Sequence, residues 1–123
     1  MKFSIVPTFS AKATMSWPSE EDPGQFRRFD FDCRFKAIEN SPEARAELQR
    51  KQDEDGIYAF LDEVLSSVKL PEIIEPVDEH DAAMDPLEWV KRNAFAGAAA
   101  SIAFWDVVNR DLEAKNSKRS RGR

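Results

Sequence analysis

With 123 residues the chain fits one domain, and a hydrophobic content of 41%, with nine Phe and three Trp, excludes global disorder. No apolar run approaches the roughly 20 residues that span a bilayer, the N-terminus lacks the apolar stretch of a signal peptide, and one cysteine forms no intrachain disulfide, all consistent with a cytoplasmic protein. The formal net charge is −5, and the chain apart from its basic last nine residues is strongly acidic, which disfavours nucleic acid as the main partner because phosphate neutralisation drives that binding.

Two alternating segments predict an antiparallel β-hairpin over residues 2–36. Apolar side chains occupy the odd positions from Phe3 to Trp17, and Pro7 places this strand at an edge or divides it. A turn-rich acidic loop follows, and then Phe29, Cys33 and the residues between them alternate again. Because a hairpin is marginal alone in water, its aromatic face needs helices against it.

The helical part is expected to span residues 41–114. Ser41 followed by Pro42, and Asp85 followed by Pro86, are signals for the start of a helix, and Asn93 is expected to cap the last one. Gly56 separates the first two helices, and Pro71 follows the second. The predicted helices span 43–52, 57–68, 87–92 and 94–114. The fold class is therefore α+β, mostly α, with one domain over residues 1–114.

The last nine residues differ from the rest of the chain in charge. Five of the 18 Lys and Arg residues lie in 115–123, which contains no acidic residue. The remainder has 13 basic and 23 acidic residues, a net charge near −10. We expect 115–123 to form a disordered basic tail, with contact to RNA or to an acidic surface as the alternative.

The last predicted helix has two apolar stripes. The first consists of Phe95, Ala98, Ile102, Trp105 and Leu112, and the second of Ala96, Ala100, Phe104, Val107 and Val108. A helix that is apolar nearly all round is central to a core or has a partner on its far side. We expect the second stripe to face outward, with burial in the core as the alternative. The residues predicted to contact a partner protein are Trp89, Phe95, Ala100, Phe104, Trp105 and Val108.

No set of residues predicts catalysis, a cofactor or a metal site. His80 is the one histidine and lies in an acidic linker without the ligand spacing of a structural metal site. Cys33 lies on the apolar face of the second strand, where a thiol is expected to be buried and inert. The aromatic residues of that strand are typical of a nucleic-acid stacking platform as well, but helices are expected to cover them. The sequence therefore favours a binding protein over an enzyme.

Ordered segments along the chain resemble a known family. Val6-Pro7-Thr8-Phe9 opens an alternating strand, Pro23-Gly24 follows, and the aromatic strand ends in Arg34-Phe35-Lys36. The middle helix contains Phe60-Leu61 and Val64-Leu65, and the last contains Ile102-Ala103-Phe104-Trp105 before Glu113-Ala114-Lys115-Asn116. This order resembles the tail assembly chaperones of long-tailed bacteriophages or prophages. One departure is Ser66-Ser67-Val68-Lys69, where relatives often carry Gly-Trp.

The resemblance implies a small domain that coats the tape measure protein, helps recruit tail tube protein during tail polymerisation and associates with itself as a homo-oligomer. It also implies no catalysis, no cofactor, and a product that acts in the cytoplasm of a bacterial host and is absent from the mature virion. Many such genes yield a longer product by translational frameshifting. The alternatives are a small virion structural or connector protein and a host-directed interaction module.

Overall fold

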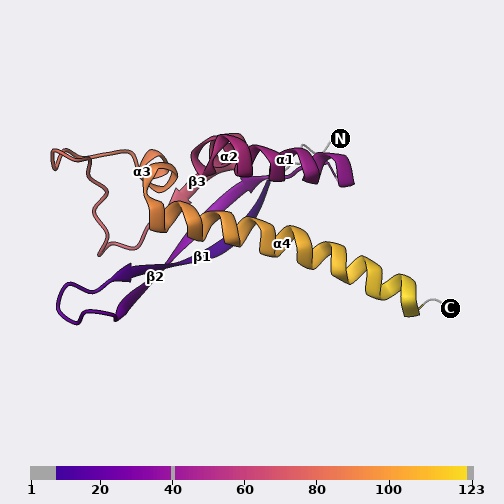
Figure 1. The fold of residues 1–123 in the computed structure, drawn as a ribbon, viewed down its shortest axis with the longest axis horizontal. Helices are drawn as coiled ribbons and strands as arrows, with labels where there is room; N and C mark the ends of the chain where they lie inside the picture. Colours follow the sequence, from indigo (N-terminus) through magenta and orange to yellow (C-terminus); the bar gives the residue numbers. More distant parts are fainter. Residues whose placement is uncertain (1–7, 40, 122–123) are drawn as a thin grey trace, which may run out of the picture.

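The computed structural model describes residues 8–39 and 41–121, which form a small α+β domain with a three-stranded antiparallel sheet and four helices (Figure 1). The sheet has the order β1-β2-β3, so β2 is the central strand. The strands are β1 (Thr8–Pro18), β2 (Phe26–Lys36) and β3 (Leu65–Lys69), and the helices are α1 (Pro42–Asp55), α2 (Ile57–Val64), α3 (Pro86–Arg92) and α4 (Ala94–Arg121).

The pairing of β1 with β2 follows the alternation of their side chains. The two strands run antiparallel over their whole length, with Ala13 opposite Phe31 and Met15 opposite Phe29. Odd-numbered side chains in the middle of both strands are buried, and even-numbered ones are exposed. One face of the sheet therefore belongs to the core. The predicted strand residues 2–7, with Pro7, lie outside the described residues.

The second helix is shorter than predicted, because its expected C-terminal residues form the strand β3. The sequence predicts a helix as far as Val68, but α2 ends at Val64, and Leu65–Lys69 pairs with β2. The register shifts between Arg34 and Phe35, so that Leu65 lies opposite Phe35 and Val68 opposite Cys33. This irregularity lets two residues three apart meet inward-facing partners, although simple alternation would place them on opposite faces. The three-residue spacing of Leu65 and Val68 is therefore also the spacing of neighbours on one face of a helix.

The predicted caps set where the helices begin. The Ser41 side chain accepts a hydrogen bond from the Ala44 backbone N–H at 3.1 Å, and Asp85 accepts from Glu88 at 3.3 Å. Asn93 accepts from the N–H groups of the second and third residues of α4. These bonds satisfy N–H groups that have no partner inside the helix. Gly56, with φ of 98°, makes the turn between α1 and α2, a conformation that other residues rarely adopt.

The orientation of α4 is the reverse of the predicted one. Ala96, Ala100 and Phe104 are buried and Val107 and Val108 are half-buried, so the stripe that was expected to face outward lies against the core. Phe95 is 40% exposed and Ile102 71% exposed, so the first stripe is the outer one over this part of the helix. α4 packs mainly along β1. The alanines suit the inward stripe because their small side chains let the helix approach the sheet closely.

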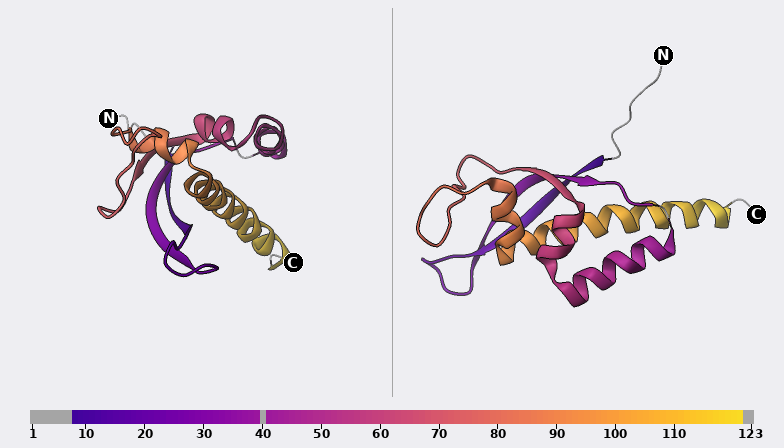
Figure 2. Two further views of the ribbon diagram at one scale, coloured as in Figure 1. Left: turned by 60° about the vertical axis from the view of Figure 1, so that its left-hand side comes forward. Right: turned by 90° about the horizontal axis from the view of Figure 1, so that it is seen from above.

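The C-terminal part of α4 extends beyond the sheet. Figure 1 and the right-hand view in Figure 2 show it running away from the turn that joins β1 and β2. Helical backbone continues to Arg121, where the sequence predicts an end near Ala114 and a disordered tail. Residues 122–123 lie outside the described residues. The domain boundary at residue 114 stays a prediction.

Replacing Phe104 by Ala is expected to lower the free energy of unfolding by about 3–5 kcal/mol, because it removes a large buried ring and leaves a cavity. Ile102→Ala is the control on the exposed side of the same helix and is expected to change this free energy by less than about 0.5 kcal/mol. Urea unfolding followed by circular dichroism measures both values. Equal destabilisation by the two substitutions would contradict the orientation of α4.

Candidate protein-interaction surface

An exposed apolar stripe runs along the outward side of α4. It consists of Phe95, Ala98 and Ile102, which we call the outer stripe. Their spacing of three and four residues places them on one helical face over two turns. Ala98 is half-buried, whereas the two larger side chains are among the exposed large hydrophobic residues of the chain. Apolar side chains in this spacing are typical of a surface that receives another helix.

Two tryptophans, Trp17 and Trp89, continue the outer stripe from Phe95 towards the sheet. Trp17, at the end of β1, stacks on Trp89 of α3 with ring centroids 6.3 Å apart and an interplanar angle of 15°. Trp17 also contacts Phe95, with centroids 5.1 Å apart. Both tryptophans are half-buried. Large aromatic residues at a partly exposed junction of three elements suit anchor positions of a protein interface.

The structure divides the six predicted contact residues into two groups. Phe95 is exposed, and the half-buried Trp89 lies beside it through their shared neighbour Trp17. Ala100 and Phe104 are fully buried within the chain, because they form part of the core face of α4. Trp105 and Val108 are half-buried and pack against the core. Of the six, Phe95 is exposed and Trp89, Trp105 and Val108 are partly exposed, and contact with a partner stays a prediction.

The Trp105 side chain is fixed by contacts with other residues of the same chain. Its ring stacks on Phe60 at 5.6 Å, and its Nε1 donates a hydrogen bond to Gln52 Oε1 at 2.8 Å. The same oxygen accepts a hydrogen bond from Ser101 Oγ at 2.9 Å. One side chain of α1 therefore binds two residues of α4. This link fixes the rotation of α4 and hence the direction that the outer stripe faces.

Three residues of the surface, Ala98, Ile102 and Trp17, were missed by sequence reasoning. Ile102 belongs to the stripe that was expected to face the core, and its exposure appears only once the rotation of α4 is known. Trp17 lies within the alternation of β1, and no local signal shows that it reaches α3 and α4. The apolar spacing of α4 was the available signal for Ile102.

A charged cluster braces α3 against α2. Lys91 is buried and its Nζ lies 3.0 Å from Asp62 Oδ1 and 3.4 Å from Glu88 Oε1. Burial opposes the charged form of Lys91, but hydrogen bonds and charge from Asp62 and Glu88 raise its pKa overall. Hydrogen bonds from Arg92 and Tyr58 lower the pKa of Glu88. These groups are paired with one another, as in a structural ion-pair network.

Cys33 and His80 are the residues considered above for catalysis or metal binding, and their surroundings in the structure do not favour either role. Burial, followed by the nearby charge of Asp32, raises the pKa of the Cys33 thiol to about 12. His80 is exposed, with Nε2 3.6 Å from Glu79 Oε1. Within the described residues, no three His, Cys, Asp or Glu side chains gather where they could hold a metal ion. None of the helices in the described part of the chain has the length and apolar content of a membrane span.

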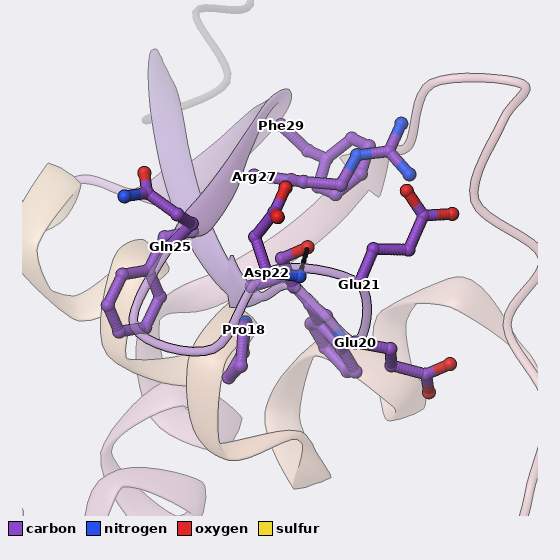
Figure 3. A pocket seen from close by; sticks show the side chains of 10 residues that line it. Pro18, Glu20, Glu21, Asp22, Gln25, Arg27 and Phe29 are labelled. Atoms are coloured by element: carbon purple, nitrogen blue, oxygen red, sulfur yellow. Dashed lines mark hydrogen bonds between the residues drawn. The ribbon is translucent and has the colours of Figure 1, made fainter.

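A cavity lies at the turn between β1 and β2. Its volume is about 720 Å³, and we call it the hairpin pocket (Figure 3). Its aromatic lining comes from both strands, and acidic residues come from the turn. The lining includes Trp17, Phe26 and Phe29 together with Glu20, Glu21 and Asp22. Trp17 also belongs to the cluster beside the outer stripe, so the two surfaces adjoin.

Comparison of the chain with protein-family models, curated proteins and solved structures finds no match.

The Cys33 thiol is expected to resist Ellman's reagent at pH 8 in the folded protein, because a pKa of about 12 keeps it protonated and the side chain is buried. The same thiol should react fully in concentrated urea, where unfolding exposes it. Absorbance of the released thiolate follows both reactions. Complete reaction of the folded protein within seconds would contradict the buried, protonated state.

Proposed function

We propose that this chain is a non-catalytic tail assembly chaperone of a long-tailed bacteriophage or prophage. In this role it binds the tape measure protein in the cytoplasm of the bacterial host and promotes polymerisation of the tail tube protein. It leaves before the virion is mature. The resemblance of its ordered segments to that family supports the proposal, and the exposure of Phe95 and Ile102 on one helical face is the structural observation that carries it.

The outer stripe suits a helical partner. Phe95, Ala98 and Ile102 present two large side chains with a small residue between them, a relief into which the ridge of another helix packs. A tape measure protein is long and rich in helices, and its apolar surface needs cover before tube subunits arrive. Burial of the mostly exposed Ile102 side chain would favour such a contact.

The charge of the chain suits transient coating. The sequence apart from residues 115–123 has a net charge near −10, from 13 basic and 23 acidic residues. A strongly charged surface keeps a protein soluble while an apolar stripe stays exposed. Many copies on one long partner would carry that charge along its length.

The test is copurification from cells that express this chain with the tape measure protein of the same phage genome. The wild-type chain is expected to carry the tape measure protein with it. Ile102→Asp is expected to reduce the recovered amount at least about tenfold, because a carboxylate on the stripe would lose its solvation on binding. Circular dichroism checks that the variant is folded.

Ile73→Asp is the matched control, since Ile73 is 68% exposed but lies in the segment between β3 and α3. It should bind as the wild type does. Failure of the wild-type chain to bind the tape measure protein, or equal loss with both variants, would contradict the proposal. Recovery of the chain in purified virions would instead favour a structural or connector protein.

A further inference from the structure

The hairpin pocket combines two features that together suit cationic side chains. Its wall contains aromatic rings, among them Phe26, which is 58% exposed. In Figure 3 the side chains of Glu20 and Glu21 extend from the turn beside that wall. Carboxylates pair with ammonium and guanidinium groups, and aromatic rings accept both the charge and the apolar stems of Lys and Arg. Within this pocket, Arg27 lies over the Phe29 ring at 5.5 Å from its centroid.

A cationic segment of matching character lies at the other end of the chain. Residues 115–123 contain five Lys and Arg and no acidic residue, and the backbone is helical to Arg121. Lys115, Lys118 and Arg119 are spaced by three and four residues, the spacing of neighbours on a helix. The charges of the pocket and of this segment are therefore complementary.

The two parts cannot meet within one molecule. Trp17 lines the pocket and contacts Phe95, the second residue of α4, whereas Lys115 lies twenty residues further along the same helix. At 1.5 Å per residue this separation is about 30 Å. Figure 1 and the right-hand view in Figure 2 accordingly show the turn and the C-terminal end of α4 on opposite sides of the molecule.

We propose that the basic C-terminal part of α4 of one copy docks in the hairpin pocket of a second copy. The contact joins two different surfaces, so each added copy still offers one unfilled pocket and one unbound basic segment. Such head-to-tail contacts generate rings where the rotation closes and open filaments where it does not. This inference concerns contact between copies, and it stands or falls separately from binding of the tape measure protein.

Self-association through this contact should depend on protein concentration and on salt. Light scattering behind a size-exclusion column, at several protein concentrations, measures the mass. At about 0.02 M NaCl the mass is expected to rise above the 14.0 kDa of one chain with concentration, and at about 0.5 M it should return towards that value because salt screens exposed charges. A monomer at every concentration in low salt would overturn the proposal.

Charge reversal tests which residues form the contact. One variant carries Glu20→Lys, Glu21→Lys and Asp22→Lys in the pocket, and a second carries Lys115→Glu, Lys118→Glu and Arg119→Glu in α4. Each variant alone should need about tenfold more protein than the wild type to associate, because several exposed ion pairs are lost together. An equimolar mixture should associate again, because the basic pocket of the first variant then meets the acidic segment of the second. The acidic pocket of the second variant likewise meets the unaltered basic segment of the first.

The control for net charge carries Glu72→Lys, Glu75→Lys and Glu79→Lys. It changes the charge by the same amount as the pocket variant, at exposed positions outside the hairpin pocket. It should associate as the wild type does, and circular dichroism confirms the fold of every variant. The proposal is overturned by equal loss in the control and the pocket variant, or by a mixture that associates no better than its two components.

Discussion

The packing of one ring, Phe104, connects the sheet to two helices. Its centroid lies 5.3 Å from that of Phe35 on β2 and 5.2 Å from that of Phe60 on α2, both in edge-on arrangements. The rings of Phe9 on β1 and of the adjacent Trp105 also lie close to it, with centroids at 5.8 and 5.1 Å. Aromatic pairs in these geometries add to the stabilisation from burial. Because Phe104 projects from α4, its place in the core fixes which side of that helix faces inward.

The outward side of α4 follows from that constraint. With Phe104 buried and Gln52 of α1 holding Ser101 and Trp105, the helix has little freedom to rotate. Two large apolar residues of α4, Phe95 and Ile102, are left at the surface. Exposure of large apolar side chains to water is unfavourable in free energy. Where such side chains share one helical face, the arrangement is typical of an interaction site. The same packing that stabilises the fold therefore creates the surface that we propose for the partner.

The sequence predicted those parts of the structure that depend on local patterns. Alternation identified the buried face of β1 and β2, and Ser41, Asp85 and Asn93 identified the starts of three helices, because side-chain caps act within a few residues. The β3 strand was missed because the irregularity opposite Arg34 and Phe35 gives its apolar residues a helical spacing. Long-range pairing, which decides that segment, leaves no local signal.

The candidate surface was harder to predict for a related reason. Both stripes of α4 are apolar, so periodicity alone does not say which one is buried. The deciding facts are the bond from Trp105 to Gln52 and the ring contacts of Phe104, which join residues far apart in the sequence. Alanine in the inward stripe and Ile102 in the outer one reverse the usual expectation that the larger side chain is buried. The contact between Trp17 and Trp89 depends on tertiary structure in the same way.

The most direct test of the account is site-specific photo-cross-linking in cells that also express the tape measure protein. A benzophenone side chain at position 102 would sit on the outer stripe, and the same group at position 73 would sit on an exposed site elsewhere. The account predicts a cross-link to the tape measure protein from position 102 and none from position 73. A cross-link from position 73 without one from position 102 would contradict it.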